Sequence, residues 1–231
     1  MAKQLELNDV ALLGRTLDEY RRIFGLSDEE LRGETILDVA SGVSSFCAEA
    51  NEGSGHVTAS DRIYALPPAE IEARCLHDLA LVMSQMPKVA DMYVWDYFPD
   101  VAALARHRER AARAFLQDFA IHGASRYVPT EYPETDFADG QFTLALVSHF
   151  LFLYEDRLSY EFHRDTVIEL LRIDSKEIRI FPLVNLKGER SALLDPLLRD
   201  PAFSGCRMMV ERVGYEFLRG ANEMLRIRVA G

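Results

Sequence analysis

The sequence predicts an α/β fold. Its sheet is expected to be doubly wound, mostly parallel and seven-stranded, with an antiparallel edge strand and a helical insertion between the second and third strands. Three observations lead to this prediction. Short apolar segments alternate with amphipathic helical patterns, which is typical of parallel βαβ units. The continuously apolar run from Phe142 to Val147 is typical of a strand covered on both faces. Residues 62–125, between the second and third predicted strands, exceed what one crossover helix requires.

Composition and charge limit the possible partners. The 231 residues include no Gly/Ser/Pro-rich linker, so a single domain spanning 1–231 is expected. The net charge of -11, from 26 Lys plus Arg and 37 Asp plus Glu, repels phosphodiester backbones. We therefore expect no nucleic-acid partner, whereas small molecules, cationic ligands and proteins stay open as partners, as does the oligomeric state.

The cysteines and the apolar stretches bear on the compartment. The three cysteines, Cys47, Cys75 and Cys206, are scattered and include no CxxC pair, which favours free thiols in a reducing compartment. The segment from Met1 to Asn8 lacks the features of a signal peptide, and the apolar stretch 142–154 is too short to span a bilayer. A cytoplasmic protein without a membrane partner is the prediction.

Two helices are predicted before the first strand. Apolar residues recur at alternating steps of three and four, at Val10, Leu13, Leu17, Tyr20 and Phe24. Asn8 or Asp9 is the expected N-cap of this first helix, and Gly25 its end. Ser27 and Glu30 have the spacing of a capping box, and Gly33 would end the short second helix.

The next segment predicts the opening of a parallel βαβ unit. Thr35–Val39 is typical of a buried strand, and a turn of small residues, 40–45, follows it. A helix is expected from Phe46, and a second strand over Val57–Ser60 ends at Asp61.

The insertion, residues 62–125, contains two apolar stripes at helical spacing. One stripe runs through 75–86 and the other through 101–119, with an aromatic cluster at 92–98 between them. We expect two helices packed over the sheet that form part of a lid. The aromatic cluster could frame an acceptor pocket or could belong to the core.

The remaining elements complete the sheet. Strands are expected near Arg126, at Phe142–Val147 and at Glu177–Phe181, with helices at Leu158–Arg172 and Ser191–Leu198. The segments Arg207–Val213 and Glu223–Val229, separated by 214–222, predict a hairpin at the edge.

Two carboxylates mark a candidate cofactor site. Asp38 interrupts an otherwise apolar strand, where a carboxylate is costly unless it is paired. Asp61 ends the next strand, 19 positions after Gly42, a separation at which a carboxylate can bind ribose hydroxyls. Each also has a simpler interpretation, Asp38 as a helix cap and Asp61 as an exposed strand end.

The runs ILDVASGVSSF, VTASD and DFADGQFTLALVSHFLFLY resemble the class I S-adenosylmethionine-dependent methyltransferase superfamily, in particular a bacterial, uncharacterised subgroup with a helical insertion. The resemblance is best over 35–61 and 126–154. It implies S-adenosyl-L-methionine as the cofactor and direct methyl transfer to a small molecule. Here the three-glycine loop becomes Ala40, Gly42 and Ser44, the least bulky replacements where a backbone must approach a ligand.

The resemblance also implies roles for individual residues. Asp38 would organise the loop, and the loop backbone would pass beside the methionine moiety. Asp61, with Arg62 next to it, would hold the ribose, Glu131 and Tyr132 would flank adenine, and Ser148 would face the reaction centre. The implied cofactor-binding residues are Asp38, Ala40, Ser41, Gly42, Ser44, Asp61, Arg62, Glu131, Tyr132 and Ser148. The implied catalytic residues are His149, as a base, and Tyr154, as its orienting partner.

Alternative functions stay open at this point. The altered glycine loop is compatible with a non-catalytic protein that binds an adenosyl cofactor. An NAD-dependent oxidoreductase also uses a βαβ turn and an acid about 20 residues further on. Its fingerprint, however, has glycines at the positions of Ala40 and Ser45, and it does not explain an acid at Asp38. His149 could be a core residue, and His163 is expected to be structural. No His/Asp/Glu set has metal-ligand spacing, so no metal is predicted.

Overall fold

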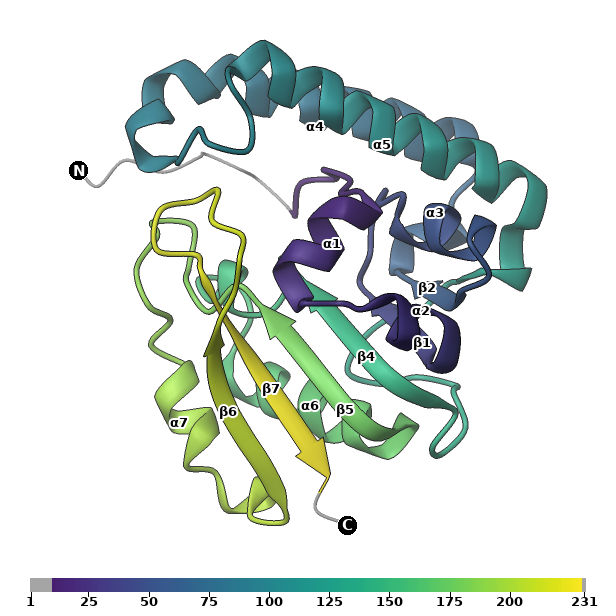
Figure 1. The fold of residues 1–231 in the computed structure, drawn as a ribbon, viewed down its shortest axis with the longest axis vertical. Helices are drawn as coiled ribbons and strands as arrows, with labels where there is room; N and C mark the ends of the chain where they lie inside the picture. The colour runs from purple at the N-terminus through teal and green to yellow at the C-terminus, as the bar shows by residue number, and fades with distance from the viewer. Residues whose placement is uncertain (1–9, 230–231) are drawn as a thin grey trace.

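The computed structural model describes residues 10–229, which form a twisted seven-stranded sheet flanked by helices (Figure 1). The strand order is β3-β2-β1-β4-β5-β7-β6. The strands are β1 (Thr35–Val39), β2 (His56–Ser60), β3 (Tyr127–Val128), β4 (Phe142–Ser148), β5 (Asp174–Phe181), β6 (Cys206–Arg212) and β7 (Glu223–Val229). The α-helices are α1 (Leu17–Phe24), α2 (Asp28–Gly33), α3 (Phe46–Glu52), α4 (Pro68–Val89), α5 (Val101–His122), α6 (Tyr160–Ile173) and α7 (Leu194–Leu198).

The sheet confirms the predicted fold class. Strands β3, β2, β1, β4 and β5 pair in parallel, whereas β7 pairs antiparallel with both β5 and β6. The antiparallel strand belongs to the predicted hairpin and lies one position inside the edge strand β6. The predicted strands agree with the observed ones to within a few residues, because apolar runs covered on both faces are a strong local signal.

Alternation along β1 assigns its residues to two cores. Ile36 packs in the cluster that contains α1 and α3, while Leu37 and Val39 pack in the cluster that contains α6 and α7. Asp38 therefore shares the face of Ile36, beneath α1. Figure 1 shows α1 and α2 on this face of the sheet and α6 on the other.

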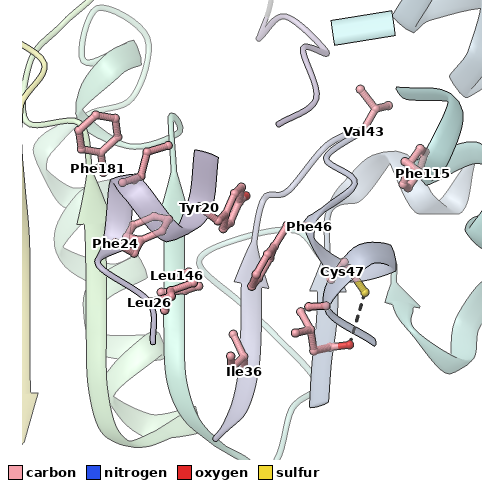
Figure 2. Close-up of a cluster of buried hydrophobic side chains, with 14 of the residues drawn as sticks. Tyr20, Phe24, Leu26, Ile36, Val43, Phe46, Cys47, Phe115, Leu146 and Phe181 are labelled. Carbon is pink, nitrogen blue, oxygen red and sulfur yellow. Dashed lines mark hydrogen bonds between the residues drawn. The ribbon is translucent and has the colours of Figure 1, made fainter. Parts of the chain in front are cut away.

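Aromatic rings fill the space between α1, α3 and the sheet. The rings of Tyr20 and Phe46 stack with their centroids 4.2 Å apart, and Figure 2 shows them side by side above β1 and β4. Phe24 and Leu146 extend the same cluster, and all four side chains are fully buried. This packing fixes α1 over the first strand and, with it, the hydroxyl of Tyr20 over Asp38.

The predicted start of the first helix is wrong. Helix α1 begins at Leu17, where Thr16 and Glu19 form a capping box, and Gly25 ends it in the left-handed conformation as predicted. Residues 10–16 are not helical. The expected caps Asn8 and Asp9 lie outside the described residues.

Tertiary hydrogen bonds replace helical ones in residues 10–16. The N–H of Leu12 donates to Asp78 Oδ2 of α4 over 2.9 Å, and the N–H of Arg15 donates to Ser44 Oγ over 3.1 Å. These partners are far away in sequence, so local spacing of apolar residues could not reveal them. The segment is thereby fixed between the insertion and the turn after β1.

The insertion contains the two expected helices. Figure 1 shows α4 and α5 side by side beyond the carboxyl ends of β4 and β5. The aromatic cluster between them packs mainly as core: Tyr93 and Phe98 are buried with Val82, Met86 and Leu104. Along residues 10–229, no helix is both long and apolar enough to cross a membrane.

Candidate functional site

Two adjoining cavities lie near the carboxyl edge of the sheet. The first, of about 220 Å³, brings together seven of the residues singled out in the sequence: Ala40, Asp61, Arg62, Glu131, Tyr132, His149 and Tyr154. The second, of about 100 Å³, shares His149 and Tyr154 with the first. Asp38, Ser41, Gly42, Ser44 and Ser148 lie behind these walls and line neither cavity.

Asp61 connects the end of β2 to the turn after β1. Its Oδ2 accepts from the N–H of Gly42 over 2.9 Å, and its Oδ1 accepts from the N–H of Ile63 over 3.0 Å. A carboxylate has about four acceptor positions, so two backbone donors leave capacity for a ligand hydroxyl. Burial raises the pKa of Asp61, and the hydrogen bonds from Ile63 and Gly42 oppose that rise.

The turn after β1 adopts the backbone conformation expected of a glycine loop. Ala40 has φ 49° and Gly42 has φ 56°, both in the left-handed region. An alanine in this region is unusual, so the surrounding contacts must hold it there. Ser41 provides one such contact, since its Oγ lies 2.6 Å from the hydroxyl of Tyr64, which also donates to the carbonyl of Gly42.

Asp38 is buried directly beneath this turn. The hydroxyl of Tyr20 donates to its Oδ1 over 2.8 Å, whereas its Oδ2 is buried without a hydrogen-bond partner. Burial raises the pKa of Asp38 well above its usual range, and the nearby Asp61 raises it further. A buried carboxylate oxygen without a partner destabilises the fold.

This cost predicts that Asp38→Asn stabilises the protein in the absence of ligand. At pH 7 we expect the free energy of unfolding to rise by about 1 kcal/mol, because the buried charge is removed while an acceptor for Tyr20 remains. The advantage should shrink as the pH falls through the raised pKa of Asp38 and vanish below about 3.8, where the wild-type carboxyl is neutral in both states. Urea unfolding of both proteins at several pH values measures it. A variant less stable than wild type at pH 7 would show that the carboxylate is structural.

The far side of the first cavity is formed after β3. The hydroxyl of Tyr132 lies 2.7 Å from Ser60 Oγ, which fixes its ring against the end of β2. Glu131 is exposed at the rim. Sequence reasoning missed Thr130, whose N–H donates to the carbonyl of Asp61 over 3.3 Å and which also lines the cavity. Because Thr130 is next to Glu131, which was predicted to flank the ligand, its sequence position could have indicated that it lines the cavity.

His149 lies at the junction of the two cavities, with an unusual backbone. Its φ is 55°, and its N–H donates to the carbonyl of Phe181 over 2.6 Å. Its Nδ1 lies 3.0 Å from Ser148 Oγ. Burial lowers the pKa of His149 well below 6.5, and the positive charges of Arg15 and Arg108 lower it further. The ring is therefore neutral at pH 7 and can accept a proton.

Tyr154, the orienting partner that the resemblance implied for His149, forms its hydrogen bond elsewhere. The Tyr154 hydroxyl accepts from the N–H of Ala11 over 3.3 Å, and Ser148 provides the hydrogen bond to the imidazole within residues 10–229. Tyr154 still lines both cavities beside His149. Its partner is in the non-helical segment 10–16, which the sequence had assigned to a helix.

Segment 10–16 separates the two cavities. Val10 and Leu12 line the first cavity, while Ala11, Leu13 and Arg15 line the second. Sequence reasoning missed all five, because the apolar spacing had been interpreted as a helix. Alternate residues of this apolar stretch line opposite cavities, and such a two-residue alternation in the sequence could have indicated them.

The residues around the first cavity fit an adenosyl ligand. Asp61 offers free acceptor positions at the wall, and Ala40 lines the cavity in a left-handed conformation. Asp38 is buried below the turn and does not line the cavity. Within residues 10–229, no group of three or more His, Cys, Asp or Glu side chains is placed to hold a metal ion.

Comparison with known proteins gives one informative relative. The uncharacterized protein MJ0045 of Methanocaldococcus jannaschii is 44% identical over 227 residues, which cover 98% of this chain and 99% of that protein. The chain belongs to the MJ0045 family. No family model matches the sequence. The relative is archaeal, whereas the resemblance drawn from the motifs was to a bacterial subgroup.

The match to MJ0045 covers nearly the whole chain, so the segment of α4 and α5 lies within the matched region. Among solved structures, a SAM-dependent methyltransferase from Aquifex aeolicus is similar at 14% identity and a TM-score of 0.44, over 97% of this chain and 94% of that one. Magnesium protoporphyrin IX methyltransferase (ChlM) from Synechocystis PCC 6803, with bound SAH, is similar at 12% identity and a TM-score of 0.47, over 92% and 81%.

Proposed function

We propose that the protein binds S-adenosyl-L-methionine in the first cavity and methylates a small molecule. The observation that carries this proposal is the position of Asp61. Its carboxylate lines the cavity at the end of β2 and holds the turn after β1 through the N–H of Gly42. A single acid thereby joins a ribose-binding position to the loop expected beside the methionine moiety.

The chain's own residues would hold the ligand at several points. Asp61 would accept hydrogen bonds from the ribose hydroxyls, and the ring of Tyr132 would pack against adenine. Asp38 would support the turn from beneath, because it is buried and lines neither cavity. A bound S-adenosyl-L-methionine supplies an activated methyl group for direct displacement, so the protein need only bind, align and exclude water.

His149 would act as the base for an acceptor that must lose a proton. It lies where the two cavities meet, its ring is neutral at pH 7, and Ser148 holds its Nδ1. The left-handed backbone at His149 fixes the direction of the ring from the end of β4. Helices α4 and α5 would cover the acceptor as a lid, because Val82, Met83 and Leu104 from these helices line the second cavity.

The assignment of His149 predicts a selective loss. We expect His149→Ala to reduce kcat about 100-fold or more while the affinity for S-adenosylhomocysteine stays within threefold of wild type. In the wild type, kcat should stay constant as the pH falls from 8 to 6.5, since the lowered pKa keeps the base neutral, and should decline only below that. Product formation with an accepted substrate measures both. Unchanged turnover in the variant, with cofactor binding intact, would remove His149 from the mechanism.

Ligand-induced thermal stabilisation tests the proposed cofactor directly. We expect S-adenosylhomocysteine at 1 mM to raise the Tm measurably, because a ligand that binds only the native state stabilises it. NAD at the same concentration is the matched control and should not change the Tm. Stabilisation by NAD alone would favour an oxidoreductase, and no shift with either ligand would contradict the proposal. Binding without methyl transfer to any of a broad acceptor panel would favour a non-catalytic adenosyl-binding protein.

A further inference from the structure

The second cavity combines an apolar wall with a buried cation. Side chains from the insertion and from the loop before β7 form most of its lining, among them Val82, Met83, Leu104 and Phe217. Arg15 and Arg108 are the basic side chains that line it. A small apolar cavity with few polar groups is typical of a specific small-molecule site.

The two arginines differ in how their charges are compensated. Arg108 donates from Nη1 and Nη2 to the two carboxylate oxygens of Glu19, over 2.7 and 2.8 Å. Arg15 forms no ion pair with a carboxylate in residues 10–229; its Nη1 donates to the carbonyl of Leu13 over 3.1 Å. Its Nε is buried without a hydrogen-bond partner. One carboxylate therefore faces two guanidinium groups, and Arg15 is the one that forms no ion pair of its own.

The direction in which the pKa of Arg15 is shifted agrees with the absence of an ion pair. Burial lowers the pKa of Arg15, and the positive charge of Arg108 lowers it further. Burial and the neighbouring positive charge therefore both disfavour the cationic form of Arg15, and Glu19 opposes them. An anion that enters the cavity would supply a hydrogen-bond partner for Arg15 and would oppose the repulsion between the guanidinium groups.

We propose that the methyl acceptor is a small carboxylate with an apolar body, which the second cavity holds through a charge-assisted hydrogen bond from Arg15. This inference rests on the proposed function. The carboxylate would lie at Arg15 and the apolar body against Val82, Met83 and Leu104. His149 and Tyr154 belong to both cavities, so the accepting atom would meet the cofactor beside them.

The size of the cavity limits the body of this acceptor. A cavity of about 150 Å³ lined by apolar side chains accommodates benzene, and the second cavity measures about 100 Å³ and shares His149 and Tyr154 with the first. The apolar body would therefore be no larger than a benzene ring, about six carbon atoms. A cationic acceptor would be repelled by Arg15, and a neutral one would leave Arg15 without an ion pair.

Calorimetric titration of benzoate into the full-length protein saturated with S-adenosylhomocysteine tests the inference. Benzoate supplies a carboxylate and an apolar ring, and benzyl alcohol is the neutral control. We expect saturable binding of benzoate and at least tenfold weaker binding of benzyl alcohol. Saturation with the product excludes binding of benzoate at the cofactor's own carboxylate position.

Two variants locate the bound probe. Arg15→Met should weaken benzoate binding at least tenfold while the affinity for S-adenosylhomocysteine changes less than threefold. Met83→Trp, which fills the cavity from α4, should abolish benzoate binding and also spare S-adenosylhomocysteine. It keeps the test decisive if Arg15→Met does not fold.

The outcomes separate this inference from the proposed function. If S-adenosylhomocysteine binds and benzoate does not, the carboxylate acceptor is wrong and the cofactor assignment stands. If Arg15→Met weakens S-adenosylhomocysteine as much as benzoate, Arg15 belongs to the cofactor site and the inference is overturned. If S-adenosylhomocysteine does not bind the wild type, the proposed function itself fails.

Discussion

Glu19→Gln is expected to lower the free energy of unfolding by about 3–5 kcal/mol. Glu19 is completely buried, and its carboxylate neutralises Arg108, which is also buried. It accepts further hydrogen bonds from the hydroxyl of Tyr215 over 2.8 Å and from the N–H of Thr16 over 3.1 Å. The amide keeps the shape but not the charge, so Arg108 stays buried and unpaired. Urea unfolding at pH 7 measures the loss.

A matched variant and a double variant test this explanation. Asp18→Asn, at the neighbouring residue, removes an exposed carboxylate paired with Arg22 and should cost less than about 1 kcal/mol. Glu19→Leu combined with Arg108→Met removes both charges of the pair and should recover part of the lost stability, since apolar residues often replace a buried ion pair at little cost. Arg15, Tyr215 and Thr16 still lose the carboxylate that faces them. If Glu19→Gln and the double variant lose the same free energy of unfolding, the unpaired charge of Arg108 is not the cause of the loss.

The same contribution has a defined pH dependence. Burial opposes ionisation of Glu19, but Arg108 and the hydrogen bond with His107 hold the pKa of Glu19 well below 4.5. The stabilisation is therefore fully present above pH 4.5. It is lost as the pH falls through the lowered pKa, where the difference between wild type and Glu19→Gln should narrow.

Asp61→Asn is expected to weaken binding of S-adenosylhomocysteine about 100-fold, equivalent to about 2.7 kcal/mol. The amide has only one acceptor oxygen, so it cannot hold both Gly42 and Ile63 and also accept from a ribose. Calorimetric titration at pH 7.5 measures the affinity.

The control for Asp61 is Glu70→Gln, which removes an exposed carboxylate in the first turn of α4 and should leave the affinity unchanged. Circular dichroism and the Tm of Asp61→Asn separate loss of ligand binding from loss of the fold. A change below threefold in a well-folded variant would exclude Asp61 from the ribose position and remove the main support for the proposed cofactor.

The strands were predictable because each carries its own signal. Thr35–Val39 was predicted with the bounds that the structure shows, and the capping box of Ser27 and Glu30 located the start of α2. In both cases the decisive interactions lie within a few residues of one another. Gly25 is a similar case, since a left-handed end of a helix is a local requirement.

The start of the first helix and the walls of the cavities depend on partners far away in sequence. Leu12 is held by Asp78 and Arg15 by Ser44, so a spacing typical of a helix occurs in a segment that has other hydrogen-bond partners. The position of Asp61 on a cavity wall was predictable from its place at a strand end. The missing ion pair of Arg15 was not, because it depends on Glu19 already being bound to Arg108.

The alternation of residues 10–15 between the two cavities links the specificities of both. Val10 and Leu12 face one compartment and Ala11, Leu13 and Arg15 face the other, so removing one residue from this stretch would exchange the two sets of side chains. Arg15 would then turn its charge toward the opposite compartment. Single substitutions in this stretch can tune either compartment alone, whereas changes in its length alter both together.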